Sequence, residues 1–286
     1  MKTAFVFPGQ GSQAVGMGLN LAEKYLDQAN EILGFDLKKL CLEGPEEELK
    51  KTEITQPAIL TVSIAAFEMI KSKGAPMPTA VAGHSLGEYS ALVAASALSF
   101  QDAVKIVHLR GKFMQEAVPL GEGAMSAIIG LDNSKIKEIC EQTGNVWPAN
   151  FNSPGQVVIS GKKESVETAG VKLKEAGAKR VIPLAVSAPF HCPLMQPAAD
   201  KLKIELDKIE IKDAAIPVCA NVTANYVTNA AEIRDLLVKQ VTNPVLWEDS
   251  VKKMLADGIN SFVEVGPGKV LSGLIKKIDR TVEVIK

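Results

Sequence analysis

The sequence predicts an α/β protein in which a short parallel sheet forms the main domain and a compact second unit is inserted into it. Two observations carry this prediction. Residues 79–98 read as a short strand, a tight turn and an apolar helix, the order found at the carboxyl edge of a parallel sheet. Residues 124–186 read as β-α-β-β-α-β, the order of a ferredoxin-like split unit, whose ends lie close together and therefore suit an insertion.

The composition is that of a globular protein of 286 residues, with 47% hydrophobic and 23% charged residues. A net charge of −1 gives no reason to expect nucleic acid or an anionic membrane as a partner. The first eight residues hold too short an apolar run for a signal peptide. The four cysteines show neither C-x-x-C nor metal-ligand spacing, so we expect no metal site and reduced thiols in a cytosolic protein.

The N-terminal stretch predicts a buried strand over Thr3–Phe7 that runs into a tight loop over residues 8–13. Residues 9–14 fit G-x-G-x-x-A, but a dinucleotide site also needs a second strand that ends in an acidic residue, and residues 19–33 read as a helix. We therefore interpret the loop as backbone that approaches a ligand at the sheet edge. Gln56-Pro57 then opens a helix that ends near Lys73, with Pro57 at its first position.

The stretch Gly83-His84-Ser85-Leu86-Gly87 matches Gly-x-Ser-x-Gly, the nucleophile-elbow pattern. A side chain at Gly83 or Gly87 would collide with neighbouring backbone, whereas Ser85 is presented at the N-terminus of the following helix. Free N–H groups and the helix dipole favour an oxyanion at that place. The alternative is a Gly/Ser turn without chemistry, but the strand before it and the helix after it favour a serine nucleophile.

The next helix, about 100–117, begins at the capping residue Ser99 and contains an anomaly. Arg110 shares a face with Ala103, Ile106 and Met114. A guanidinium in an apolar stripe needs an anionic partner. That partner is either an internal Asp or Glu, or a substrate carboxylate held by two parallel hydrogen bonds.

The inserted unit is predicted after the boundary at Gly121-Glu122-Gly123. Its strands are expected over 124–131, on both sides of the turn at 152–155, and over 180–186, with helices over 134–142 and 164–176. The chain then returns to the main domain through a proline-rich loop that contains His191 between Pro189 and Pro193. A serine nucleophile needs a base, and His191 is the best candidate among three histidines, since His84 adjoins the serine and His108 lies on the Arg110 helix.

The rest of the chain predicts helices over 197–206, 231–240 and 247–256 and strands over 217–222 and 261–265. At this point five motifs resemble those of the bacterial malonyl-CoA:acyl carrier protein transacylase family. They are Phe7-Pro8-Gly9-Gln10-Gly11-Ser12-Gln13, Gly83-His84-Ser85-Leu86-Gly87-Glu88, Asn150-Phe151-Asn152-Ser153-Pro154-Gly155-Gln156, Pro189-Phe190-His191 and Glu264-Val265-Gly266-Pro267-Gly268. The resemblance covers essentially the whole chain.

The resemblance implies a ping-pong acyl transfer in which Ser85 attacks malonyl-CoA while His191 takes its proton. The backbone N–H groups of Gln10 and Leu86 are expected to hold the oxyanion. Arg110 is expected to pair with the malonyl carboxylate.

Two further residues are implied by the same resemblance. The histidine is expected to be oriented by a backbone carbonyl near Gln240 instead of by an aspartate. Phe190, a bulky aromatic just before the histidine, goes with malonyl in preference to methylmalonyl.

The resemblance also implies the architecture and the partners. The expected fold is an α/β-hydrolase-like core over residues 1–120 and 187–286, with a ferredoxin-like subdomain over 121–186. Malonyl-CoA and acyl carrier protein are the expected partners, with no cofactor, no metal, no nucleic acid and no membrane, and we expect a cytoplasmic monomer that serves fatty-acid synthesis.

Three alternatives stay open at this stage. A serine hydrolase or thioesterase could use the same elbow, although a plain esterase needs no carboxylate clamp such as Arg110. A non-catalytic acyl- or CoA-binding module would need no nucleophile and base together. A transacylase that serves a polyketide synthase cannot be told from a fatty-acid enzyme by sequence.

Overall fold

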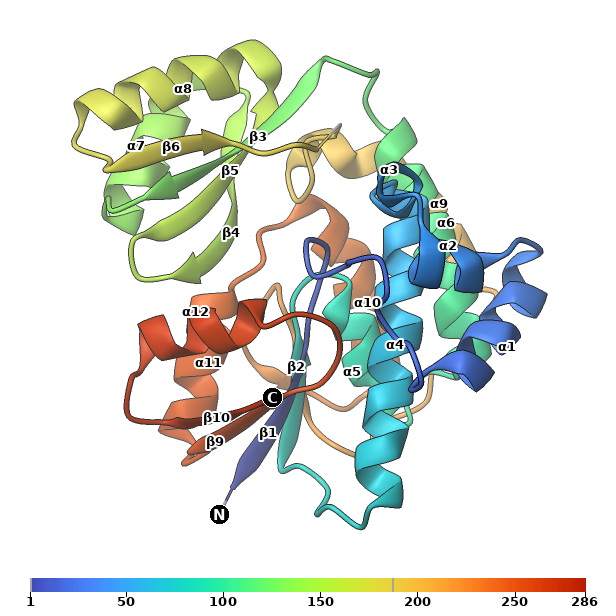
Figure 1. The fold of residues 1–286 in the computed structure, drawn as a ribbon. Coiled ribbons are helices and arrows are strands. Elements are labelled where there is room, and N and C mark those ends of the chain that lie inside the picture. Colours follow the sequence, from blue (N-terminus) through green and yellow to red (C-terminus); the bar gives the residue numbers. More distant parts are fainter. Residues whose placement is uncertain (1, 187) are drawn as a thin grey trace.

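The main sheet has six strands in the order β10-β9-β1-β2-β7-β8 in the computed structural model, which describes residues 2–186 and 188–286 (Figure 1). The strands are β1 Thr3–Phe7, β2 Ala80–Gly83, β7 Val218–Cys219, β8 Tyr226–Val227, β9 Ser261–Glu264 and β10 Glu283–Ile285. All neighbours pair in parallel except β8, which forms an antiparallel hairpin with β7. The loops after β1, β2 and β7 therefore meet at one edge of the sheet, where ligands of open α/β sheets bind.

Helices cover both faces of this sheet because side chains alternate along β1. Phe5 and Phe7 join the larger core, whereas Ala4 and Val6 join a smaller core on the opposite face. The helices of the larger core are α1 Glu23–Leu33, α2 Leu37–Glu43, α3 Glu46–Leu49, α4 Thr52–Ser72, α5 Gly87–Ala94, α6 Phe100–Glu116, α9 Gln196–Leu206 and α10 Ala230–Thr242. The smaller core is closed by α11 Trp247–Ala256 and α12 Val270–Ile278.

A second, antiparallel sheet has the order β4-β5-β3-β6 and forms a separate lobe (Figure 1). Its elements are β3 Gly123–Ile129, α7 Asn133–Thr143, β4 Val146–Ser153, β5 Gln156–Lys162, α8 Lys163–Glu175 and β6 Arg180–Pro183. The predicted β-α-β-β-α-β order is confirmed, and with it the α/β fold class. The last strand ends at Pro183 and not at Val186. The division at 120/121 and 186/187 stays a prediction, and residue 187 lies outside the described residues.

The start of α4 differs from the prediction that Pro57 occupies the first helical position. The helix begins at Thr52, so Pro57 lies inside it. A proline there leaves the carbonyl of the residue four positions earlier without its helical N–H partner. That carbonyl belongs to Glu53, and it instead contacts Nδ1 of His108 at 2.9 Å. The predicted position of Pro57 at the start of the helix was wrong, because the His108 side chain on α6 gives the Glu53 carbonyl the hydrogen bond that Pro57 cannot donate.

The same helix, α4, has the length and apolar composition of a membrane span. Within the protein, 72% of its most apolar 18-residue window is buried. Its buried side chains, Ile59 and Leu60 among them, belong to the larger core. We therefore interpret α4 as the core helix of the main domain.

The two lobes meet beside the carboxyl edge of the main sheet. Residues 149–151 of β4 bond to the backbone of Val245, with N–O distances of 2.9 Å in both directions. At the start of β3, a Cβ on Gly123 would lie 2.3 Å from Cδ of Pro189, so the proline ring packs directly on the glycine backbone. This close contact places the loop that carries His191 between the two sheets.

Candidate active site

The nucleophile elbow forms between β2 and α5, as the sequence predicts. A Cβ on Gly83 would lie 1.9 Å from the carbonyl carbon of Gly87, and a Cβ on Gly87 would lie 2.1 Å from the carbonyl oxygen of Phe7. Only glycine fits at either position. Ser85, between them, has a φ of +51°. A left-handed conformation of this kind costs a non-glycine residue about 1–3 kcal/mol and persists only where the surroundings enforce it.

Ser85 and His191 form a hydrogen-bonded pair. Oγ of Ser85 lies 2.8 Å from Nε2 of His191, and Nδ1 of His191 lies 2.8 Å from the backbone carbonyl oxygen of Gln240. A carbonyl oxygen only accepts, so Nδ1 of the neutral ring carries the proton and Nε2 is free to accept from the serine hydroxyl. This is the arrangement that a general base needs.

The buried position of His191 controls its charge. Burial, followed by the positive charge of Arg110, lowers the pKa of His191 from its usual 6.5 to about 3. The imidazole is therefore neutral, and competent as a base, at pH values where an exposed histidine is already protonated.

We predict that acylation of Ser85 by an excess of thioester is insensitive to pH between 8 and 5, within about a factor of two. Because its pKa is lowered, His191 stays neutral as the pH falls. The acylation rate should therefore decrease only at pH values well below 6.5. The measurement is the single-turnover acylation rate across this range by rapid quench. A midpoint near 6.5 would show that His191 titrates like an exposed histidine and would contradict the buried, neutral state.

Arg110 lies on α6 and is 1% exposed. Its Nη1 donates to Oε1 of Gln56 at 2.8 Å, and its Nη2 donates to Oε1 of Gln240 at 2.9 Å and to Oγ of Ser85 at 3.0 Å. Over residues 2–186 and 188–286, no carboxylate forms an ion pair with it. The direct contacts of the guanidinium are thus neutral oxygens next to the nucleophile, and the buried Glu88 carboxylate is linked to it only through Gln240. These direct contacts favour the substrate-carboxylate interpretation over an ion pair with an internal acid.

Gln10 and Leu86 lie beside Ser85 and line the same cavity. Leu86 is the N-cap residue of α5, and Gln10 belongs to the loop after β1. In the described part of the chain, neither backbone N–H has a hydrogen-bond acceptor. The side chain of Gln10 makes only a long contact, 3.4 Å from its Nε2 to Oγ1 of Thr52. Two free N–H groups near a serine hydroxyl meet the requirement for an oxyanion hole.

A cavity of about 130 Å³ opens in front of Ser85 and His191. Its lining comes from both lobes, and the apolar part consists of Leu86, Met114, Met125, Leu184, Val186 and Phe190. Phe190 is buried, and it precedes His191 directly in the chain. A cavity of this size and lining is suited to a small organic group.

The other two histidines make different contacts. Nε2 of His84 lies 2.8 Å from Oδ1 of Asn152 in β4, and its ring packs on Trp247. His108 contacts the carbonyl of Glu53, as described above. Among the hydrogen bonds of the described residues, neither ring contacts Ser85.

Three residues at the site were missed from the sequence: Gln56, Glu88 and Asn221. Gln56 and Glu88 are polar side chains in otherwise apolar, buried helices, and this signal could have identified them. Asn221 had no signal, because it follows the two-residue strand β7 in a stretch of irregular backbone.

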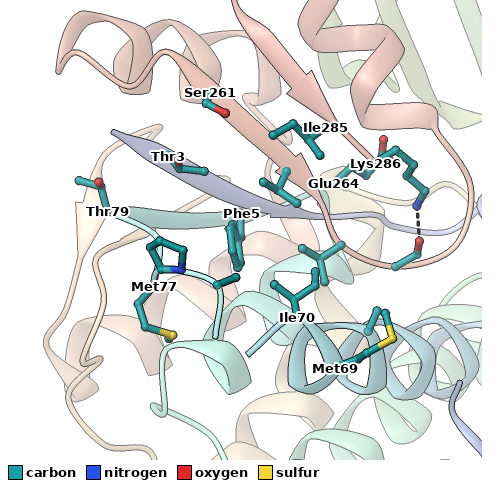
Figure 2. A pocket seen from close by; sticks show the side chains of 16 residues that line it. Thr3, Phe5, Met69, Ile70, Met77, Thr79, Ser261, Glu264, Ile285 and Lys286 are labelled. Atoms are coloured by element: carbon teal, nitrogen blue, oxygen red, sulfur yellow. Dashed lines mark hydrogen bonds between the residues drawn. The ribbon is translucent and has the colours of Figure 1, made fainter. Parts of the chain in front are cut away.

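A larger cavity of about 680 Å³ lies away from this site, between α4 and the part of the main sheet formed by β1, β9 and β10 (Figure 2). Its lining is mostly apolar, and Lys286 donates to the carbonyl oxygen of Gly266 there. The lining contains neither histidine nor cysteine, and its Glu264 carboxylate accepts hydrogen bonds from the N–H groups of Leu271 and Ser272. Across the described residues, no cluster of three or more His, Cys, Asp or Glu side chains could hold a metal ion.

Comparison with known proteins adds independent evidence. A model of the acyl transferase domain family matches residues 4–284. The chain is 55% identical to the malonyl CoA-acyl carrier protein transacylase of Salmonella typhimurium over 96% of this chain and 92% of the relative. It is 53% identical to the Bacillus subtilis protein of the same name, over 99% of this chain and 92% of the relative.

Solved structures agree with the sequence relatives. The acyl carrier protein S-malonyltransferase of Vibrio cholerae superposes with a TM-score of 0.97 at 49% identity, covering 100% of this chain and 96% of that chain. A malonyl-transacylase in complex with a type II polyketide-synthase acyl-carrier protein superposes with a TM-score of 0.97 at 49% identity, covering 99% and 95%.

Proposed function

This chain belongs to the acyl transferase domain family, and we propose that it transfers the malonyl group of malonyl-CoA to the phosphopantetheine thiol of acyl carrier protein through a malonyl-serine intermediate. The observation that supports this most directly is the hydrogen-bonded pair of the half-buried Ser85 and the buried His191 beside Arg110, with which no carboxylate in the described part of the chain forms a direct ion pair. A nucleophile, a base and a carboxylate-binding cation within one small cavity are the groups that this reaction needs.

We infer the steps of the first half-reaction from the hydrogen bonds of Ser85. Oγ of Ser85 attacks the thioester carbonyl carbon while its proton passes to Nε2 of His191. The tetrahedral oxyanion is held by the backbone N–H groups of Gln10 and Leu86. Collapse of the intermediate breaks the carbon–sulfur bond, and the imidazolium returns the proton to the departing CoA thiolate.

The second half-reaction repeats these steps with a different thiol. His191 takes the proton of the phosphopantetheine thiol, whose sulfur attacks the malonyl-serine ester. Ser85 leaves and recovers its proton from His191. Both partners therefore occupy the same cavity in turn, which is the structural basis of ping-pong kinetics.

Arg110 is placed to recognise the acyl group that Ser85 carries. Its Nη2 reaches Oγ of Ser85 itself, at 3.0 Å, so the guanidinium lies within reach of an acyl group on that oxygen. A malonyl carboxylate would match the buried charge, whereas an acetyl group would leave it unmatched. We infer that this difference selects malonyl.

Replacing Arg110 by alanine is expected to lower kcat/KM for malonyl-CoA by about 100-fold or more, because the substrate carboxylate would be buried without a partner. Acetyl-CoA transfer should hold steady or rise, since the unmatched charge is gone. The measurement is kcat/KM for malonyl-, methylmalonyl- and acetyl-CoA in the wild type and in Arg110→Ala. Arg280→Ala, at an exposed position, is the control for loss of an arginine. An equal decrease for all three substrates would make Arg110 structural.

Phe190 is expected to discriminate among the same substrates by the size of the acyl group. Its ring lines the cavity directly before His191 and limits room for a branched acyl group. We expect poor use of methylmalonyl-CoA by the wild type and better use in Phe190→Ser. The same kcat/KM comparison tests this expectation.

We propose that the protein acts as a cytoplasmic monomer in fatty-acid synthesis, without a cofactor or a metal. The curated relatives carry the same transacylase name over nearly their whole length, which supports this pathway. A similar structure is bound to a polyketide-synthase carrier protein, so a comparison of rates with the two kinds of carrier protein is the test that separates the pathways.

A further inference from the structure

The strained elbow is held by a side chain from another strand loop. Nδ2 of Asn221 donates to the carbonyl oxygen of Gly83 at 2.7 Å, and its Oδ1 accepts from the backbone N–H of Ser85, also at 2.7 Å. β7 pairs in parallel with β2 up to Cys219 and Ala82, and Asn221 comes two residues later. The side-chain amide of Asn221 thus takes the place of the backbone–backbone hydrogen bonds between β2 and β7 at the point where the turn leaves the sheet.

Asn221 is in turn fixed by a buried carboxylate on the helix after the elbow. Oε2 of Glu88, which is 2% exposed, accepts from the backbone N–H of Asn221 at 2.9 Å. The same oxygen accepts from Nε2 of Gln240, also at 2.9 Å. One carboxylate oxygen therefore ties the loop after β7 and helix α10 to the first turn of α5.

Gln240 connects this arrangement to the reacting groups. Its Nε2 also donates to the carbonyl oxygen of Ser85 at 3.1 Å, and its Oε1 accepts from Arg110. Because Glu88 only accepts and Arg110 only donates, they fix which end of the Gln240 amide faces which neighbour. The backbone N–H of Ser85 thus donates to the side chain of Asn221 and its carbonyl accepts from that of Gln240, two residues that also donate to Glu88.

A buried carboxylate is expensive to keep, which indicates a specific use. Burial raises the pKa of Glu88 to about 7, although its hydrogen bonds from Asn221 and Gln240 and the charge of Arg110 act in the opposite direction. Both of the donors reach the same oxygen, so a single neutral carbonyl oxygen could accept them both. The geometry therefore requires a hydrogen-bond acceptor at this position and does not require a negative charge.

We propose that Glu88 and Asn221 are positioning residues that hold Ser85 in its left-handed conformation, with its hydroxyl directed at His191, and that Glu88 acts as a hydrogen-bond acceptor. This inference rests on the proposed role of Ser85 as the nucleophile. It assigns no contact with substrate to either residue. The two residues act through the backbone of Ser85.

The test compares Asn221→Ala, Glu88→Ala and Glu88→Gln with a control, Asn225→Ala, an exposed asparagine on the same loop. The readouts are the rate of labelling by a fluorophosphonate serine probe, and kcat and KM for malonyl-CoA. We expect Asn221→Ala and Glu88→Ala to lower the labelling rate about 10- to 100-fold, because small misplacements of reacting groups are costly. Asn221→Ala should lower kcat by a similar factor with KM unchanged, since Asn221 does not contact Arg110.

Glu88→Gln is the decisive variant because its amide oxygen can replace Oε2 without a charge. We expect its labelling rate to stay within about threefold of the wild type. Labelling as slow as in Glu88→Ala would overturn the acceptor role, and wild-type labelling of a folded Asn221→Ala would overturn the positioning role. If Asn221→Ala does not fold, the pair of Glu88 variants still decides. The probe carries no malonyl group, so failure of the proposed substrate is seen separately, as a labelled wild type that transfers no malonyl.

Discussion

Replacing Ser85 by alanine will abolish malonyl transfer. Oγ of Ser85 is the atom that faces both Nε2 of His191 and the guanidinium of Arg110, so its removal leaves the base without a nucleophile to activate. We expect a loss on the order of 10⁴-fold or more in kcat, as for other enzymes that lose a serine nucleophile. The measurement is transfer of radiolabelled malonyl from malonyl-CoA to acyl carrier protein.

A second serine provides the control for this variant. Ser90 is buried on α5, five positions further along, and its hydroxyl has no hydrogen-bond partner within the described residues. Ser90→Ala should therefore transfer malonyl at the wild-type rate. Substantial transfer by Ser85→Ala, with label on Cys192 instead, would mean that the elbow does not carry the nucleophile.

Replacing His191 by alanine has the second largest expected effect. Without Nε2, no group within residues 2–186 and 188–286 is left to accept the proton of Ser85, because the second hydrogen-bond partner of Oγ there is the donor Arg110. We expect the acylation rate to fall on the order of 10³- to 10⁶-fold, as in other Ser–His systems. The measurement is single-turnover acylation of the variant by malonyl-CoA.

His108 gives a matched control for the loss of a histidine. It contacts the Glu53 carbonyl that Pro57 leaves without a helical partner, and it lies outside the site cavity. His108→Ala should lower the melting temperature but keep the acylation rate. Acylation by His191→Ala within about tenfold of the wild type would show that another group accepts the proton.

The elbow and the inserted unit were predictable from the sequence because their signals are local. The two glycines of the elbow lie within five residues of each other and mark it in the sequence, although Gly87 is required by the distant backbone of Phe7. The β-α-β-β-α-β order is carried by short periodic segments. The beginning of α4 was not predictable, because the cost of Pro57 is offset by His108, which is distant in the sequence. Helix α12 was also missed. Its N-terminus is capped by the Glu264 carboxylate, which accepts from the N–H groups of Leu271 and Ser272.

The site shows the same division between local and long-range signals. Arg110 was identified because a charge in an apolar helical stripe is visible in sequence, and Ser85 because its motif is compact. Asn221 and Glu88 were not, since their importance lies in hydrogen bonds to residues 136 and 133 positions away. Periodicity cannot show such contacts, because they arise only when the ends of β2 and β7 meet at one edge of the sheet.

The covalent intermediate is the central claim, and intact-mass analysis after brief exposure to malonyl-CoA without carrier protein tests it most directly. We predict an increase by the mass of one malonyl group, located by peptide mapping on the peptide that contains Ser85, and lost again when acyl carrier protein is added. An unchanged mass, or an adduct that maps to another residue and persists in Ser85→Ala, would contradict the account.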